Sequence, residues 1–398
     1  MKAVVFHGVG RISVDEVEKP TIEAPTDAVV RLTASAICGT DLHFIRGTMA
    51  GTREGRILGH EGVGVVEQVG DYVRNLVPGD RVVIPSTVAC GTCSYCRAGY
   101  YAQCDNANPN GPGTAFFGGP EDAGGLDGLQ AQYARIPYAN VGLVKLPDQV
   151  SDEQAILISD IFPTGYQAAE QAEIETGDVV CVFGCGPVGQ FAIWSARYLG
   201  AGRVIAVDSV ADRLEAAREQ GCEVVNFMDE DPVEMIHEMT RGVGPDRVID
   251  CVGIDANRRP GEDDERFEEA IAQLVPERAE NGWQPGSGPT QALEWAVEVI
   301  AKAGTLSIIG VYPPTCTTFP IGAAFMKNLT VKLGNCNHRA YIPKLVELVR
   351  TGVIDPTVLV TKHEPMSSAV EAYEAFDKRT AGWLKIELEP QAAAAETR

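Results

Sequence analysis

The chain has 398 residues, a net charge of −22 at pH 7 and 11 cysteines. Hydrophobic residues make up 45% of it and charged residues 22%, a globular composition that excludes a disordered or collagen-like chain. At about 150 residues per domain, this length predicts two or three domains. So negative a surface repels phosphate backbones, and we therefore expect no nucleic acid among the partners.

Membrane insertion and secretion are also disfavoured by the sequence. No apolar run reaches the roughly 18 residues of a membrane-spanning helix. The start, MKAVVFHGVG, has no apolar core before a cleavage site, so it predicts a first strand and turn rather than a signal peptide. The cysteines are too sparse for a disulfide scaffold and cluster as metal-binding thiols do in a reducing compartment. We therefore expect a cytoplasmic protein.

The predicted elements change character along the chain. Short β-branched runs such as VVRLTASAIC, GVGVVEQVG and DRVVIP predict β structure with many turns over residues 1–155. From VVCVFG and FAIWSARYLG to RVIDCVG and SIIGV, strands alternate with helices, which predicts a doubly wound parallel sheet over residues 156–311. A charged, Pro- and Gly-rich insertion interrupts this series at residues 255–290. We expect residues 312–398 to return to the first domain and to end in a frayed tail, QAAAAETR.

A lobe at residues 88–125 contains Cys90, Cys93, Cys96 and Cys104 in the pattern C-x2-C-x2-C-x7-C. Four thiolates so close together can surround one tetrahedral Zn²⁺ and leave no open position, so this site would stabilise the fold. An iron–sulfur cluster is the competing interpretation, because close cysteine spacings hold those as well.

A second group of residues could hold a metal with an open position. Cys38 and the His60 of GHEG supply two ligands, and a catalytic zinc needs three protein ligands beside its exchangeable position. Asp160, in LISDIFPTG, is our candidate for the third. A lone Cys and a lone His are more often core residues, so the residues by themselves leave this site undecided.

The run GCGPVG follows the apolar strand VVCVF and opens a helix, which is the context of a dinucleotide-binding loop. The pyrophosphate would lie at the helix N-terminus, where free N–H groups point towards it. About twenty residues further on, Asp208 would accept hydrogen bonds from the ribose and repel a 2′-phosphate, which favours NAD over NADP. The residues that we expect around the cofactor are Gly184, Gly186, Pro187, Val188, Gly189, Asp208, Arg213 and Val252.

These pieces, in this order, resemble the zinc-containing medium-chain alcohol dehydrogenases. The resemblance covers nearly the whole chain and implies an α/β fold, with a GroES-like catalytic domain and a Rossmann NAD-binding domain. Within the superfamily the chain looks most like the glutathione-independent formaldehyde dehydrogenases and formaldehyde dismutases. The closer match lies in SDIFPTGY at residues 159–166, in QAQYARIPYANVGLVKLPD, and in DCVG followed by an insertion.

The resemblance implies two zinc ions per subunit, with Cys38, His60 and Asp160 holding the catalytic one. Most members have a Cys where Asp160 stands, and a carboxylate is typical of the formaldehyde-oxidising branch. As a harder ligand it should leave zinc a stronger Lewis acid. The resemblance also implies Glu61 as a transient ligand, and a buried acid paired with an Arg is an equally good interpretation of that residue.

The resemblance implies roles for the residues around these ligands too. Asp41 matches a carboxylate that orients His60. Thr40 and His43 match a relay that carries the substrate proton to solvent, with His43 as a near-surface imidazole. Zinc would lower the pKa of the substrate hydroxyl while NAD accepts the hydride.

We expect formaldehyde hydrate to be oxidised to formate, or, if NADH stays bound, formaldehyde to dismutate to formate and methanol. Two alternatives remain. One is a zinc alcohol or polyol dehydrogenase for longer primary alcohols or aldehydes. The other is a non-catalytic protein that binds zinc and nucleotide, against which the intact set of site residues argues. By analogy with relatives that pair subunits near residues 306–311, we expect a homodimer or homotetramer.

Overall fold

The computed structural model describes residues 1–261, 264–275, 279 and 282–391. The chain divides into two compact units: unit 1 contains Met1–Pro163, Glu277–Trp283 and Cys336–Arg398, and unit 2 contains Thr164–Pro276 and Gln284–Asn335. These divisions come later than the predicted boundaries at residues 155 and 311. The first is later because helix α4 (Asp152–Ser159) packs on the sheet of unit 1. The second is later because strand β13 (Thr330–Leu333) completes the sheet of unit 2.

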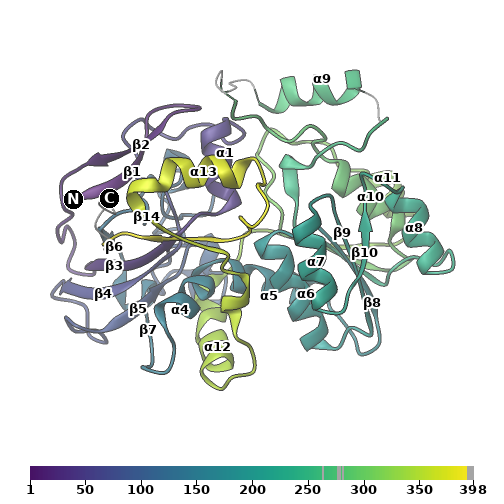
Figure 1. Ribbon diagram of the computed structural model, residues 1–398. Helices are drawn as coiled ribbons and strands as arrows, with labels where there is room; N and C mark the ends of the chain where they lie inside the picture. The colour runs from purple at the N-terminus through teal and green to yellow at the C-terminus, as the bar shows by residue number, and fades with distance from the viewer. Residues whose placement is uncertain (262–263, 276–278, 280–281, 392–398) are drawn as a thin grey trace. The chain divides into compact units, whose positions relative to one another are not determined.

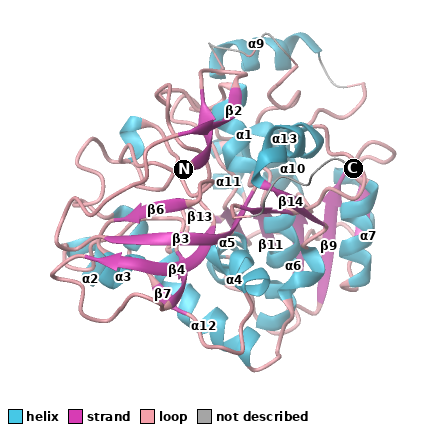
Figure 2. Ribbon diagram, turned by 60° about the vertical axis from the view of Figure 1, so that its left-hand side comes forward, coloured by secondary structure: helices cyan, strands magenta, loops and turns pink. Residues whose placement is uncertain are grey.

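Unit 1 is built around a seven-stranded sheet in the order β14-β15-β3-β4-β5-β7, with β6 also paired to β3. Neighbouring strands are antiparallel, apart from the parallel pair β14 and β15. Figure 2 shows β3, β4 and β6 side by side. The strands are β3 (Ala28–Ala36), β4 (Gly62–Val69), β5 (Arg81–Ile84), β6 (Tyr133–Ile136), β7 (Val144–Lys145), β14 (Lys362–Pro365) and β15 (Ile386–Glu389).

The core of unit 1 is formed by apolar side chains from these strands, among them Val30, Leu32, Val66 and Ile84. A separate two-stranded sheet pairs β1 (Lys2–Phe6) with β2 (Ile12–Glu16). Besides α4, the helices are α1 (Gly39–Arg46), α2 (Ser94–Arg97), α3 (Ala139–Gly142), α12 (His338–Arg350) and α13 (Ala369–Asp377). Short 3-10 turns lie at Tyr101–Gln103, Glu121–Ala123, Pro356–Leu359 and Met366–Ser368.

Unit 2 contains the predicted doubly wound sheet (Figure 1): six parallel strands in the order β10-β9-β8-β11-β12-β13. This is the strand order of a dinucleotide-binding fold. Along β8 (Val179–Phe183), Val180 and Val182 face one apolar core while Cys181 and Phe183 face the other, because successive side chains point to opposite faces. The other strands are β9 (Arg203–Asp208), β10 (Glu223–Asn226), β11 (Arg247–Asp250) and β12 (Thr305–Ile308).

Helices cover both faces of this sheet, as expected of parallel strands joined by crossovers. They are α5 (Ile161–Gln171), which begins in unit 1, α6 (Pro187–Leu199), α7 (Ala211–Glu219), α8 (Pro232–Met239), α10 (Gln291–Val299) and α11 (Ile321–Met326). The expected insertion contains helix α9 (Asp264–Leu274) and follows a 3-10 turn at Gly253–Asp255. The expected frayed tail lies, after Gln391, outside the described residues. Among the helices described, none is long and apolar enough to cross a membrane.

Candidate metal and cofactor sites

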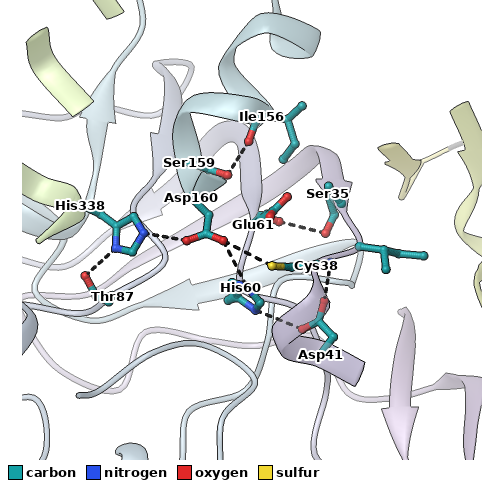
Figure 3. A network of polar contacts seen from close by, with 12 residues as sticks. Ser35, Cys38, Asp41, His60, Glu61, Thr87, Ile156, Ser159, Asp160 and His338 are labelled. Atoms are coloured by element: carbon teal, nitrogen blue, oxygen red, sulfur yellow. Dashed lines mark hydrogen bonds and ion pairs between the residues drawn. The ribbon is translucent and has the colours of Figure 1, made fainter. Parts of the chain in front are cut away.

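Cys38, His60, Glu61 and Asp160 form one buried group in unit 1, which we call the open site. Each offers a ligand atom, and these atoms all lie within 4.8 Å of one another. Asp160 Oδ2 lies 3.6 Å from Cys38 Sγ and 3.3 Å from His60 Nε2 (Figure 3). The pairing of β3 with β4 explains why Cys38 and His60 lie close together, because Ser35 of β3 pairs with Gly62 of β4. This pairing places the end of β3 beside the start of β4, and α4 carries Asp160 at its C-terminal end.

The imidazole of His60 is fixed by a carboxylate, that of Asp41, as the family resemblance implies. Asp41 Oδ1 lies 3.0 Å from His60 Nδ1, and its Oδ2 accepts a hydrogen bond from the Cys38 N–H at 3.0 Å. Asp41 is fully buried and stands in the first turn of α1, whose N-cap is Cys38. One carboxylate thus orients two of the predicted ligands, leaving His60 Nε2 directed at Asp160.

The sequence did not predict His338, which contacts Asp160 on the side away from the other ligands. His338 Nε2 lies 2.7 Å from Asp160 Oδ1, and its Nδ1 lies 3.1 Å from the hydroxyl of Thr87. Burial would raise the pKa of Asp160, but hydrogen bonds from His338 and His60 hold that pKa well below its usual range. Burial lowers the pKa of His338, whereas Cys336 and Asp160 raise it, to about 10. No signal in the sequence pairs two residues that are 178 positions apart.

Glu61 belongs to the open site and also forms a buried ion pair. Its Oε2 contacts the ammonium of Lys385, which also donates to the Ile37 carbonyl at 3.0 Å. The alternative expected for Glu61 was an acid paired with an Arg, and the cation is a Lys instead. Burial raises the pKa of Glu61 to about 7 against the opposing charge of Lys385. Among the described residues, Oε1 of Glu61 is buried with no hydrogen-bond partner, so one carboxylate oxygen is available for a ligand role.

The predicted relay residues both lie on α1. Thr40 is half-buried, and His43 follows three positions later on the same face of the helix. His43 was expected as a near-surface imidazole, but it is only 5% exposed in unit 1. The reason is that α1 packs with Leu42, Phe44 and Ile45 buried, so the helix is covered on several faces.

The four cysteines of the lobe form a second group, which we call the closed site. Cys90, Cys93, Cys96 and Cys104 offer sulfur atoms that all lie within 4.8 Å of one another. Cys90 Sγ accepts hydrogen bonds from the N–H groups of Thr92 and Cys93, each at 3.3 Å. Burial raises the pKa of Cys90, but these contacts and the Thr92 hydroxyl outweigh burial and lower the pKa to about 6. The four sulfurs suit a metal ion with tetrahedral coordination, and they would fill all four of its coordination positions.

The glycine-rich loop joins β8 to α6 in unit 2. Gly184 has φ +86, a conformation that favours glycine, and a Cβ on Gly189 would lie 1.8 Å from the Gly184 carbonyl oxygen. Near Gly186, a Cβ would meet nothing closer than Arg213 at 3.6 Å, so backbone there is open to a ligand. Pro187 is the first residue of α6, and Val188 and Gly189 follow in its first turn. This arrangement suits a pyrophosphate at the helix N-terminus.

Asp208 ends β9 and is fixed by backbone N–H groups. Its Oδ2 accepts from Cys185 at 2.7 Å, and its Oδ1 accepts from Ser209 at 2.7 Å and from Val210 at 2.9 Å. Arg213 Nη1 lies 3.9 Å from the same carboxylate. The carboxylate therefore stands beside the glycine-rich loop, where the sequence predicted a ribose ligand.

Val252 lies next to Gly184, because a Cβ built on that glycine would fall 2.7 Å from a Val252 methyl group. Its position is set by Asp250, whose Oδ1 accepts from the Val252 N–H at 2.8 Å. The hydroxyl of Tyr312 donates to the other oxygen of Asp250 at 2.7 Å. Asp250 and Tyr312 were not predicted from the sequence.

Comparison with known proteins places the chain in a family. Residues 24–148 match the alcohol dehydrogenase GroES-like domain, and residues 187–260 match the zinc-binding dehydrogenase family. An uncharacterized zinc-type alcohol dehydrogenase-like protein of Bacillus subtilis is 39% identical, over 98% of this chain and 100% of its own length. A glutathione-independent formaldehyde dehydrogenase of the same organism is 33% identical, over 78% of this chain and 75% of its own length.

A solved structure, that of an alcohol dehydrogenase from Thermus sp. ATN1, matches with a TM-score of 0.80 and 35% identity, covering 98% of this chain and 99% of that one. The predicted fold class, a GroES-like domain with a Rossmann domain, is thereby confirmed. The chain belongs to the zinc-type medium-chain alcohol dehydrogenase superfamily, whose members are oxidoreductases.

Proposed function

We propose that this protein oxidises formaldehyde, in the form of its hydrate, to formate, with zinc in the open site and NAD as the hydride acceptor. The observation that carries the proposal is the carboxylate ligand: Asp160 Oδ2 faces Cys38 Sγ and His60 Nε2 at 3.6 and 3.3 Å. An oxygen ligand is harder than the sulfur that the family resemblance implies for most members at this position, and this favours a strongly acidic metal. The similarity to a formaldehyde dehydrogenase supports the same substrate.

The donor set of the open site fits zinc, since a thiolate, an imidazole and a carboxylate are all common zinc ligands. When bound, zinc supplies a Lewis acid that lowers the pKa of a hydroxyl group. Cys38, His60 and Asp160 would hold it, and Asp41 keeps His60 in position. The hydroxyl of Thr40 would accept the substrate proton and pass it towards His43. The balance is that formaldehyde hydrate and NAD⁺ give formic acid, NADH and one proton.

We propose NAD rather than NADP because of the carboxylate of Asp208. Its charge stands beside the glycine-rich loop, where it would accept hydrogen bonds from a ribose diol and repel a 2′-phosphate. Arg213 lies near the same loop and would cover the adenine.

The closed site would hold a second zinc ion, giving two per chain. None of the 11 cysteines forms a disulfide, which suits the reducing cytoplasm that we propose as the protein's location.

We also propose that the chain forms a homodimer or homotetramer. Strand β13 is the last in the sheet order of unit 2, and the chain around it carries exposed apolar side chains. Ile321, Phe325, Met326 and Leu333 are 71%, 78%, 79% and 67% exposed. Exposed apolar side chains within and shortly before an edge strand suit pairing with a second copy. Light scattering tests this, with Phe325→Asp expected to shift the protein towards the monomer.

The activity is tested by assaying the purified protein against formaldehyde, methanol and a series of longer alcohols, with and without added NAD⁺. Turnover of formaldehyde that requires NAD⁺ supports the proposal. Turnover without added NAD⁺, with nucleotide released on denaturation, supports dismutation to formate and methanol. Turnover confined to longer alcohols favours the second candidate, an alcohol dehydrogenase for longer substrates. The similarity to the Thermus alcohol dehydrogenase supports alcohol oxidation in general. No turnover with any substrate overturns both.

A further inference from the structure

The two oxygens of Asp160 face different partners. Oδ2 is directed at Cys38 Sγ and His60 Nε2, on the side where a metal would be held. Oδ1 is directed away from them and lies 2.7 Å from His338 Nε2 (Figure 3). A carboxylate can bind a metal through one oxygen or through both, and it can rotate between these modes. A hydrogen bond on one oxygen therefore decides which oxygen the metal receives.

His338 is itself held in place. It is the first residue of α12, it is only 3% exposed, and its Nδ1 lies 3.1 Å from the hydroxyl of Thr87. Thr87 is 5% exposed and follows β5 in the central sheet of unit 1. Both ring nitrogens thus have a hydrogen-bond partner, Thr87 at Nδ1 and Asp160 at Nε2. Rotation of the imidazole would break two hydrogen bonds in a buried place, which is costly.

The same kind of contact is found at His60, the neighbouring ligand, with the carboxylate and the imidazole exchanged. At His60 a carboxylate, Asp41, orients an imidazole ligand at 3.0 Å. At Asp160 an imidazole, His338, orients a carboxylate ligand. Partners of this kind fix the geometry of metal ligands and commonly change metal affinity by about 10- to 100-fold when they are removed.

We infer that His338 is a positioning residue that keeps Asp160 bound to the metal through Oδ2 alone and so sets metal affinity and geometry in the open site. The inference rests on the proposed function only in requiring a metal at Cys38, His60 and Asp160. It does not depend on which alcohol or aldehyde is the substrate. Because His338 would act through Asp160, it is not assigned contact with the substrate.

The experiment compares zinc retention in His338→Leu, which removes the hydrogen bond, with that in His338→Gln, whose amide can still donate to Asp160. Zinc release to a chelator is followed in the holoenzyme. We expect His338→Leu to bind the open-site zinc about 10- to 100-fold more weakly. We expect His338→Gln to recover much of the loss. Cys90, Cys93, Cys96 and Cys104 provide an internal control, because their zinc should be released as in the unchanged protein.

A second readout is the visible absorption spectrum of the protein with Co²⁺ in the open site. We expect the bands to shift in His338→Leu, because the coordination of Asp160 changes, and to return towards those of the unchanged protein in His338→Gln. His363→Leu is the matched control, since His363 lies in the same unit and its side chain is 46% exposed. This variant should keep both the zinc affinity and the spectrum.

Two results would overturn the inference. One is a His338→Leu protein that keeps the zinc affinity and the Co²⁺ spectrum of the unchanged protein. The other is equal loss of zinc from both sites with a lower melting temperature, which is the mark of a purely structural role. The proposed function can fail separately: normal open-site zinc with no formaldehyde turnover rejects the substrate while leaving the role of His338 intact.

Discussion

The two metal sites of unit 1 are assembled in opposite ways. The ligands of the closed site lie in one short segment, from Cys90 to Cys104, and nearby backbone N–H groups hydrogen-bond to their sulfurs. The ligands of the open site come from three segments, and Cys38 and Asp160 are 122 residues apart. The closed site thus depends on local sequence, whereas the open site exists only when β3, β4 and α4 have packed together.

The surroundings of the two sites differ as well. Asn106 and Thr92, which are neutral, contact the sulfur of Cys90 in the closed site. Charged or ionisable side chains contact the ligands of the open site: Asp41 at His60, His338 at Asp160 and Lys385 at Glu61. Neutral neighbours suit a site that only holds a structure together. Ionisable neighbours can adjust the charge and orientation of ligands that take part in a reaction.

Removing a ligand of the open site is the most direct test of the difference between the two sites. Cys38→Ala should lower kcat/KM by at least about 10³-fold, because the Lewis acid that stabilises charge on the substrate oxygen is lost. Zinc content, measured by atomic emission, should fall from two ions per chain to one. Cys316→Ala is the matched control, since Cys316 lies outside both sites, and it should change neither value. Full activity in Cys38→Ala would remove the open site from the mechanism.

A change in the closed site should act on stability instead. Cys96→Ser leaves three thiolates around an ion that needs four ligands, so the lobe loses its main cross-link. The free energy of unfolding should drop by roughly 3 kcal/mol or more, because structural zinc binding contributes directly to folding. Denaturant unfolding measures this, and zinc analysis should find one ion remaining. Unchanged stability with a collapse of activity would mean that the two sites have been assigned the wrong way round.

The role of charged neighbours is tested at Asp41. Asp41→Asn keeps the size of the side chain but removes the charge that lies 3.0 Å from His60 Nδ1. The open-site zinc should bind about 10- to 100-fold more weakly, as measured by competition with a chelator. Asp71→Asn, at an exposed position of the same unit, should bind zinc as the unchanged protein does. Equal affinities in the two variants would show that the orientation of His60 does not depend on the carboxylate.

The predictions from the sequence were most specific where the signal was local. The spacing of Cys90, Cys93, Cys96 and Cys104 predicted the closed site, and the strand–loop–helix context of Gly184 predicted a dinucleotide loop. The doubly wound sheet followed from alternating strands and helices, but its end was placed too early. Strand β13 lies beyond residues 312–329 and has only four residues, so its membership of the sheet is visible only in its pairing with β12.

Partners that meet over long separations could not be predicted in this way. Asp160 was named as a candidate ligand from its place in LISDIFPTG, but the residues alone left the open site undecided, and only the family resemblance favoured it. His338 and Lys385 lie 178 and 324 residues from the carboxylates that they contact. A lone His at a helix start and a lone Lys before a strand resemble ordinary surface residues. Only the packing of α12 and β15 against the rest of unit 1 buries them at the open site.

Strand β15 supplies the smallest test, because two buried acids near it differ in their partners. Lys385, just before the strand, pairs with Glu61, whereas Glu387 lies 3.6 Å from His363 and near Glu153 and Asp152. Burial raises the pKa of Glu387 from 4.5 to about 7, and these acids add to the effect. Between these two pH values Glu387 loses its proton in the unfolded chain but keeps it in the folded protein. The free energy of unfolding therefore falls as the pH rises through this range.

Glu387→Gln cannot ionise and should escape this loss. The difference in unfolding free energy between the variant and the unchanged protein should be larger at pH 8 than at pH 5, by on the order of 1–2 kcal/mol in favour of the variant. Denaturant unfolding at both pH values measures the difference. Glu371→Gln, at an exposed position on α13 of the same unit, should show no such pH-dependent gain. If the two variants behave alike, the ionisation of Glu387 does not destabilise the fold.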